Sequence, residues 1–138
     1  MTADNVSDYR IVGLPNVQIV LASASRTRRR LLEDAGVPHI VKPSRVDEDE
    51  IKLSLRADGA SGVALAEVLA EAKATYVSRK HPDAMVLGAD QVLVCEGETF
   101  DKPVDREDAL RQLQSLRGKR HDLISYAVIV RGGQRIWQ

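Results

Sequence analysis

The first part of the chain pairs a short apolar run with a polar, helix-like segment. Val17–Ala22 (VQIVLA) is rich in β-branched residues, which predicts a buried strand. Small serines follow at Ser23 and Ser25, and Arg26–Ala35 then has helical character up to Gly36, a residue type that commonly ends helices. This unit is therefore predicted to be a strand, a tight loop and a helix.

A second strand and a central helix are predicted next. Val37–Val46 is predicted to be extended, although its two prolines weaken the pattern. After an acidic run and a loop at residues 57–62, Val63–Ser78 carries apolar residues spaced by four, three and four positions. That spacing places them on one helix face, with Lys73 beside the stripe: Leu65, Leu69, Ala72 and Tyr76.

A further buried strand is predicted at Met85–Ala89, ending at Asp90, with Val92–Cys95 extended beyond it and a turn at residues 96–98. Asp105 is then expected to cap a helix that ends at Gly118. Three leucines mark the expected buried face of that helix: Leu110, Leu113 and Leu116. The last predicted elements are a strand, a diglycine turn and the start of a return strand: Leu123–Val130, Gly132-Gly133 and Arg135–Trp137.

The composition is that of an ordinary globular domain. The 138 residues can bury a real core, and 43% are hydrophobic and 29% charged. Lys plus Arg and Asp plus Glu number 20 each, so the zero net charge argues against broad electrostatic binding of DNA, RNA or an anionic membrane. Helices alternate with strands, which predicts an α/β or mixed α+β fold. We expect residues 1–16 to be a leader and residues 17–138 to form one domain.

Several features favour the cytoplasm. The longest apolar stretches are too short to span a membrane, and the N-terminus lacks the basic start and apolar core of a signal peptide. Cys95 is the single cysteine, so no intramolecular disulfide can form, and a reducing compartment is expected.

Two charged segments are candidates for chemistry. The Ser23–Ser25 loop at a helix N-terminus, with Arg26, Arg28, Arg29 and Arg30 behind it, could hold a phosphate on backbone N–H groups and guanidinium groups. If these arginines are taken alone, a solvated basic helix face is the favoured interpretation. The acidic run at residues 47–50 could supply oxygen ligands to a hard metal ion, although an exposed acidic loop is the commoner case.

Three single residues are further candidates. Asp90 lies at the predicted carboxyl end of an apolar strand, where ligands of open α/β sheets bind, but it could also be a structural residue bonded to backbone amides. Lys102 precedes a proline in a loop, and Lys73 lies near an apolar helix edge. Each lysine could bind phosphate or could simply be a surface residue. The histidines have no metal-ligand spacing: His39, His81 and His121.

Taken in order, the segments LASASRTRRRLLEDAG, RVDEDEI, LAEAKA, LGADQVLVCEGETFDKP and LRGKRHDLISYAVIV resemble the Maf-like nucleoside triphosphate pyrophosphatases from about Ile19 onward. The resemblance implies an elongated, twisted mixed sheet with helices, similar to the inosine-triphosphate pyrophosphatases, and a cleft between two lobes. It also implies a cytoplasmic enzyme that depends on Mg²⁺ or Mn²⁺ and is often a homodimer. Its suggested roles are removing modified nucleotides or restraining cell division.

The resemblance assigns roles to individual positions. The phosphate-contacting residues would be Ser23, Ser25, Arg28, Lys73 and Lys102. The metal would lie at Glu48, with Asp47 beside it, and at Asp90, which would also be the catalytic residue. Gln91 would face the base, and glutamine there resembles the group of relatives that prefers 7-methyl-GTP.

Two departures from the family pattern bear on activity. Many members read Ser-x-Ser-Pro-Arg-Arg, whereas Arg26 and Thr27 replace the proline and the first arginine here. The family's glycine-rich C-terminal segment has no match, so we expect the domain to be C-terminally incomplete. The sequence therefore predicts a nucleoside triphosphate pyrophosphatase, with a truncated, non-catalytic nucleotide-binding protein as the alternative. A basic-helix module for RNA or protein contacts is disfavoured by the neutral net charge and low aromatic content.

Overall fold

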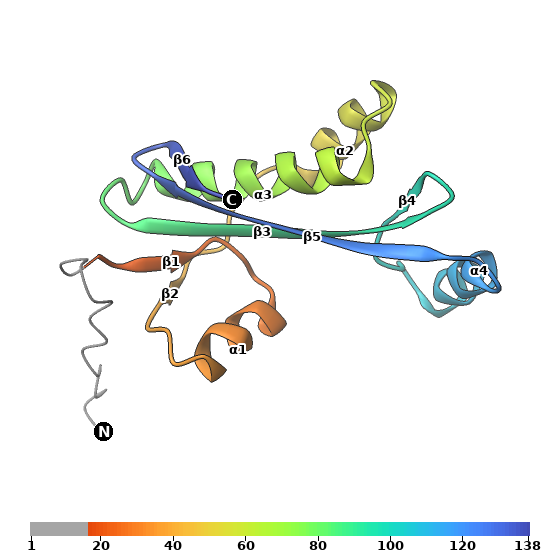
Figure 1. Cartoon of the computed structure of the whole chain (residues 1–138), viewed down its shortest axis with the longest axis horizontal. Helices are drawn as coiled ribbons and strands as arrows, with labels where there is room; N and C mark the ends of the chain where they lie inside the picture. Colours follow the sequence, from red (N-terminus) through yellow and green to blue (C-terminus); the bar gives the residue numbers. More distant parts are fainter. Residues whose placement is uncertain (1–16) are drawn as a thin grey trace.

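The computed structural model describes residues 17–138, so the predicted leader at residues 1–16 lies outside the described residues. A six-stranded mixed sheet has helices packed against it, which confirms the predicted mixed α/β class (Figure 1). The elements in chain order are β1 (Ile19–Leu21), α1 (Arg26–Asp34), β2 (Ile40–Val41), α2 (Glu48–Ala57), α3 (Gly62–Ser78), β3 (Met85–Cys95), β4 (Glu98–Phe100), α4 (Arg106–Leu116), β5 (His121–Arg131) and β6 (Gln134–Trp137).

The sheet has the order β2-β1-β3-β5-β6, and β4 pairs with β3 outside this path. β1 runs parallel to β2 and β3, whereas β4 and β5 are antiparallel to β3, and β6 is antiparallel to β5. β3 and β5 form a long two-stranded ribbon, and in Figure 1 the ribbon runs from the part that carries β1 to an arm that carries β4 and α4.

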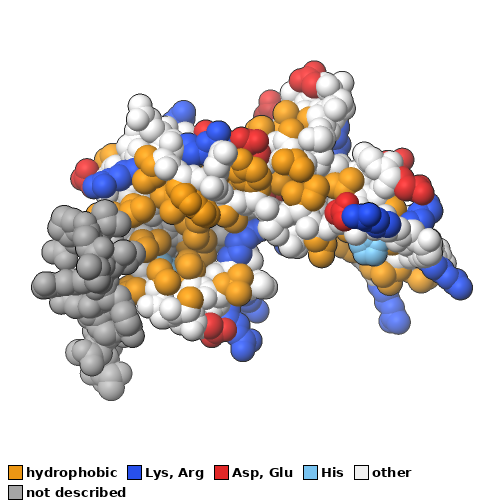
Figure 2. All heavy atoms as spheres, viewed as in Figure 1, with side chains coloured by type: hydrophobic (Ala, Val, Ile, Leu, Met, Phe, Trp, Pro, Cys, Tyr) orange, Lys and Arg blue, Asp and Glu red, His pale blue; other side chains and the backbone are white. Residues whose placement is uncertain are grey.

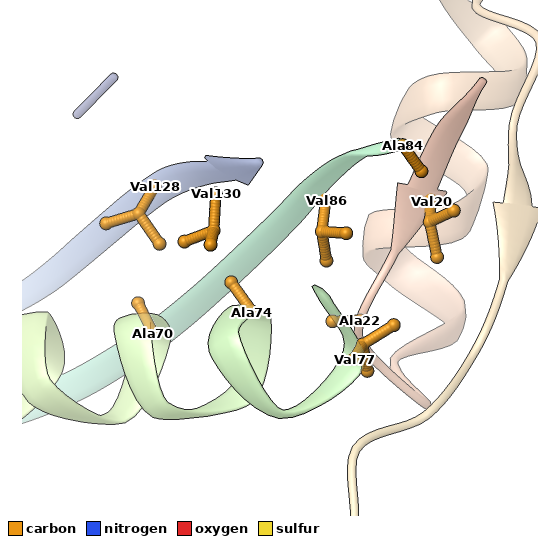
Figure 3. Packing of buried hydrophobic residues seen from close by; sticks show 9 residues of the cluster. All are labelled: Val20, Ala22, Ala70, Ala74, Val77, Ala84, Val86, Val128 and Val130. Carbon is orange, nitrogen blue, oxygen red and sulfur yellow. The ribbon is translucent and has the colours of Figure 1, made fainter. Parts of the chain in front are cut away.

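The core lies between α3 and one face of this ribbon. Side chains alternate along a strand, so the even-numbered residues of β3 and β5 face α3. Figure 3 shows valines of the strands opposite small residues of the helix; the cluster comprises Val20, Ala22, Ala70, Ala74, Val77, Ala84, Val86, Val128 and Val130. A second cluster near the start of α3 comprises Leu65, Ala66, Leu69 and Val92.

Gly88 lets α3 approach the sheet unusually closely. A Cβ atom at this position would collide with the carbonyl oxygen of Ala70 and would lie 2.7 Å from the Cβ atom of Ala74. The backbone of the helix can therefore rest directly on β3 one pleat before Asp90. This close packing brings the long side chain of Lys73 within reach of the same strand.

The predicted helix face of α3 was partly wrong. The buried stripe runs through Leu65, Leu69, Lys73 and Val77, whereas Ala72 and Tyr76 are only half-buried at its edge. Lys73 was expected beside the stripe and instead lies within it. Charge had excluded Lys73 from the apolar pattern, although its spacing of four from Leu69 places it on the same face.

The predicted strand boundaries also need correction. Only Ile40–Val41 of the strand expected at Val37–Val46 pairs with β1, because flanking prolines have no N–H group to give to a ladder. β3 does not end at Asp90 but continues to Cys95, since β5 pairs with it throughout. Asp90 is therefore a mid-strand residue, and the rule for strand carboxyl ends does not apply to it.

Two helices differ from expectation. The acidic run forms the first turn of α2, where Asp47 caps the helix and negative charge suits the positive end of its dipole. α4 has the expected cap and length but no buried residue; Leu110 and Leu113 are 55% and 65% exposed. α4 lies at the outer end of the arm (Figure 1), where no described element covers its apolar face. None of the helices within residues 17–138 combines the length and the hydrophobicity that a membrane-spanning helix needs.

Candidate active site

One edge of β3 is open at its centre. β5 occupies the other edge, while β1 pairs with Met85–Leu87 and β4 with Leu93–Cys95. Within the described part of the chain, residues 88–92 have no strand beside them on this edge, and Asp90 is the middle residue. We call this stretch the open edge.

The chain that leaves β1 enters one end of the open edge. β1 and β3 are parallel, and their last pair is Leu21 with Leu87. Ser23 and Asp90 both lie just beyond that pair in the same direction. The loop between β1 and α1 therefore starts beside the open edge.

Hydrogen bonds fold this loop around buried Ser23. The Ser23 Oγ atom accepts from the Ser25 N–H group at 3.1 Å and from Arg28 Nη1 at 3.3 Å. Ser25 caps α1, and its Oγ atom accepts from the Arg28 N–H group at 3.3 Å. The loop thus gathers two hydroxyl groups, a guanidinium group and the N-terminus of a helix, which together can bind an oxyanion.

The neighbouring arginines have other partners. Arg29 pairs with Glu33 at 2.8 Å and Arg30 with Asp34 at 3.5 Å, each one turn further along α1 on its solvent side. Of the four arginines considered in the sequence, Arg28 is the one whose side chain bonds back to the loop. Arg29 and Arg30 therefore belong to a solvated basic face of α1, whereas the side chain of Arg28 is bonded to the loop.

The chain that leaves β4 approaches the open edge from the opposite end. β4 is antiparallel to β3 and its last pair is Phe100 with Leu93. Asp101 and Lys102 therefore continue toward residues 91–92. Lys102 is exposed, and together with Arg28 it brings positive charge to both ends of the open edge.

Lys73 joins two carboxylates at the centre. Its Nζ atom lies 2.5 Å from Glu48 Oε1 and 2.9 Å from Asp90 Oδ1. The exposed fractions of the side chains are 11% for Lys73, 14% for Asp90 and 41% for Glu48. Since an ammonium group has three N–H donors, a third remains for a phosphate oxygen. The structure thus brings together one residue each from α2, α3 and β3, which are far apart in the sequence.

The two carboxylates suit a divalent ion that is completed by substrate. Mg²⁺ in proteins is commonly held by one or two carboxylates together with phosphate oxygens and water. Glu48 and Asp90 supply two such groups, and both contact the Lys73 ammonium group in this structure. The described residues contain no group of three or more His, Cys, Asp or Glu side chains arranged for a metal. Asp47 does not point to this centre, because its carboxylate accepts the Glu50 N–H bond at 3.0 Å as a helix cap.

Gln91 lies on the other face of β3. Side chains alternate along a strand, so Gln91 points away from α3 when Asp90 points toward it. Its Nε2 atom donates to Ser125 Oγ at 3.0 Å, across the β3–β5 pair. We call Lys73, Glu48 and Asp90 the Lys73 centre. The sheet separates Gln91 from this centre, so one ligand can touch both only across the open edge.

Sequence reasoning missed a group of residues on α2 and after β4. Arg56 and Lys52 bind the carboxylate of Asp101, and hydrogen bonds from Arg56 lower the pKa of Asp101 below its ordinary value. The helix that carries Lys52 and Arg56 was not predicted. A capping aspartate followed by a glutamate three residues later, with Ile51 and Leu55 one turn apart, was the available signal.

Comparison with known proteins identifies relatives of the whole described region. The family model for Maf-like proteins matches residues 18–138. A nucleoside triphosphate pyrophosphatase of Ruegeria sp. is 52% identical over 123 residues, covering 89% of this chain and 62% of the relative. One of Granulibacter bethesdensis is 47% identical over 121 residues, covering 88% and 61%. A 7-methyl-GTP pyrophosphatase of Brucella abortus is 43% identical over 122 residues, again covering 88% and 61%. The chain thus spans about 60% of the length of these curated relatives.

Proposed function

Since the chain belongs to the family of Maf-like proteins, we propose that it hydrolyses a nucleoside triphosphate to the monophosphate and pyrophosphate with a divalent metal ion. The observation that carries the proposal is the meeting of Lys73 with Glu48 and Asp90 at the open edge, between positive groups at either end. Two of the relatives are named as nucleoside triphosphate pyrophosphatases, which supports the same reaction.

The triphosphate is proposed to lie along the open edge. Ser23, Ser25 and Arg28 hold phosphate oxygens at one end, Lys102 holds them at the other, and Lys73 directs its third N–H donor to them from α3. Because Arg28 and Lys73 are held by hydrogen bonds and ion pairs before substrate arrives, they stabilise the charge that grows on the leaving pyrophosphate without reorganisation.

The reaction needs a water molecule placed at the α-phosphorus. A bond forms from the water oxygen to phosphorus, the bond from phosphorus to the bridging oxygen breaks, and pyrophosphate leaves. Asp90 orients the water and accepts its proton. Glu48 and Asp90 would hold Mg²⁺ or Mn²⁺, which when bound neutralises phosphate charge and makes water a better nucleophile.

We propose that the base is recognised at Gln91 and that 7-methyl-GTP is preferred. One N–H group of Gln91 Nε2 donates to Ser125, which leaves the second N–H group and the Oε1 acceptor for a ligand. Guanine presents N–H donors on its edge, which such an acceptor can bind. One relative is named as a 7-methyl-GTP pyrophosphatase, which supports this finer assignment.

A second candidate function is nucleotide binding without cleavage. The chain spans about 60% of the length of its curated relatives, and the remainder of those proteins could contribute groups that turnover needs. The loop at Ser23 and the Lys73 centre would still bind phosphate. In this case nucleotide raises the melting temperature while no pyrophosphate is released.

The oligomeric state is proposed from the family resemblance, and the cell compartment from that resemblance together with the single cysteine. We propose a homodimer in the cytoplasm. Light scattering after size-exclusion chromatography should give twice the chain mass of 15.2 kDa. A mass equal to one chain at micromolar concentration contradicts the dimer.

The test is pyrophosphate release from 7-methyl-GTP, UTP and dTTP, with Mg²⁺, with Mn²⁺ and with a chelator. Release should require the metal, and Asp90→Asn should lower kcat by at least about a hundredfold, since it removes a base and a metal ligand. Asp83→Asn is the matched control, because Asp83 is an exposed aspartate in the turn before the same strand. Near-normal turnover of Asp90→Asn would contradict the proposed mechanism. No release from any triphosphate by the wild type, with nucleotide-dependent stabilisation, supports the binding-only candidate.

A further inference from the structure

A polar cluster ties α2 to the loop between β4 and α4. The Arg56 guanidinium group binds Asp101 with two bonds, from Nη1 at 3.2 Å and Nη2 at 3.0 Å, and its Nε donates to Thr99 Oγ1 at 2.9 Å. Lys52 Nζ reaches Asp101 Oδ1 at 3.2 Å. We call these four residues the Asp101 clamp.

The geometry of the clamp is specific. A guanidinium group and a carboxylate that meet through two parallel bonds fix orientation as well as distance, which a single ion pair does not. The backbone carbonyl of Asp101 also accepts from Gln112 Nε2 at 2.9 Å, so α4 is tied to the same point. Hydrogen bonds from Arg56 lower the pKa of Asp101, as expected when these bonds favour the charged form of the carboxylate.

One face of α2 links the Asp101 clamp to Glu48 and its contact with Lys73. Glu48, Lys52 and Arg56 are spaced by four residues, so they lie along one side of the helix. Glu48 at the first turn meets Lys73, and the other two meet Asp101. The residue after Asp101 is Lys102. The clamp therefore joins the element that carries Glu48 to the segment that carries Lys102.

Apolar packing does little to hold the same two parts together. Neither α2 nor α4 has a fully buried residue among those described, and β4 pairs with β3 through three residues. α2 contacts α3 through Ile51 and Leu55 at the edge of a core cluster. Beyond this pairing and packing, the side-chain contacts of the Asp101 clamp tie the segment of Lys102 directly to the helix of Glu48.

We propose that the Asp101 clamp is a positioning device that holds Lys102 at a fixed place relative to Glu48 and Lys73, and so sets the affinity of the site for a triphosphate. The inference rests on the proposed function for its ligand, a chain of phosphates. Asp101 and Arg56 do not touch that ligand; they act through Lys102.

The test uses Asp101→Asn, Lys102→Ala and the double variant, with inorganic tripolyphosphate and Mg²⁺ as the binding probe in calorimetry. Asp101→Asn keeps the shape but loses the charge that Arg56 and Lys52 hold. Its Kd for tripolyphosphate should rise about tenfold, the effect of losing one charged hydrogen bond. In the Lys102→Ala background, Asp101→Asn should add less than about twofold. Asp122→Asn is the control, because Asp122 is an exposed aspartate in a long surface pair with Arg120.

A steady-state assay gives a second measurement, the separate effects on KM and kcat, which a purely structural role of Asp101 would not distinguish. Asp101→Asn should raise KM for the nucleotide more than it lowers kcat, and Asp101→Glu should recover most of the loss. The proposal is wrong if Asp101→Asn raises the Kd for tripolyphosphate by the same factor in the wild-type and Lys102→Ala backgrounds. It is also wrong if Asp101→Asn leaves the Kd unchanged. If the wild type binds tripolyphosphate with the expected dependence but releases no pyrophosphate, the clamp stands and the proposed cleavage fails. A wild type that does not bind tripolyphosphate overturns both.

Discussion

Lys73→Met is the sharpest test of the electrostatics at the centre of the molecule. Methionine is unbranched and only one atom shorter than lysine, so it replaces the apolar stem within the buried stripe of α3 and packing changes little. The ammonium group disappears, and with it the partner of Asp90 and Glu48. Any large loss of stability therefore reports the cost of leaving two carboxylates without a cation.

The expected loss in the free energy of unfolding depends on how far water can solvate each carboxylate once the ammonium group is gone. Asp90 keeps 14% exposure, and removing one partner of a buried pair typically costs about 3–5 kcal/mol. Glu48 is 41% exposed and can rehydrate, so its share is within about 1 kcal/mol. We expect a loss of about 3 kcal/mol, at the low end of the range because the centre opens onto the edge of the sheet.

A second substitution separates charge from packing. Lys73→Met combined with Asp90→Asn replaces a stranded carboxylate by a neutral amide, so the double variant should be at least about 1 kcal/mol more stable than Lys73→Met alone. Lys80→Met is the matched control, since Lys80 is an exposed lysine whose Nζ atom lies 5.0 Å above the Tyr76 ring; its effect should stay within about 1 kcal/mol.

The assay is urea unfolding at neutral pH, followed by far-ultraviolet circular dichroism, with the slope of the transition compared between variants. An unchanged slope with a lower midpoint means that native stability alone has changed. A loss below about 1 kcal/mol for Lys73→Met, or a double variant less stable than the single one, would refute the claim that Lys73 neutralises a buried carboxylate.

Three further predictions concern packing, specificity and pH. Gly88→Ala should lower the free energy of unfolding by about 1–3 kcal/mol in urea titrations, because its Cβ atom would meet the backbone of α3 at Ala70. Gln91→Thr should lower the ratio of kcat/KM for 7-methyl-GTP over UTP about tenfold, and an unchanged ratio removes Gln91 from base recognition. Hydrogen bonds from Arg56 lower the pKa of Asp101, so its stabilisation is complete above the unfolded aspartate pKa and lost as the pH falls through the folded pKa. The stability difference between wild type and Asp101→Asn should therefore be constant from about pH 5 to 8 and shrink below about pH 4.

Local sequence patterns predicted the helices and strands whose signals lie within their own residues. β1 and the second half of β5 are apolar runs because they carry core residues, and the cap at Asp105 is local in sequence. The strand break expected at Asp90 was wrong because a polar residue in an apolar run resembles a strand end. β5, some thirty residues later, continues the ladder past it. α2 was missed because half of its ten residues are charged. Whether another element covers α4 depends on tertiary contacts, which sequence periodicity does not contain.

The candidate site was predicted residue by residue but not as an arrangement. The resemblance assigned roles to Glu48, Lys73 and Asp90, yet their convergence depends on where α2 and α3 sit over β3, and on Gly88 permitting close contact. The Asp101 clamp was beyond reach for a related reason. Arg56 and Asp101 are 45 positions apart and lie on elements that no local pattern connects.

The topology of the sheet explains why a site can form in the middle of a strand at all. A central strand normally has a neighbour on both edges, so Asp90 and Gln91, on opposite faces, could not share a ligand. Here one edge of β3 is used first by parallel β1 and then by antiparallel β4, and the two run toward each other and stop short. In the proposed function, the substrate passes from the Lys73 face to the Gln91 face at the stretch left open at residues 88–92. A nucleotide has the chemistry for such a path, since its phosphates suit the charged face and its base suits the amide.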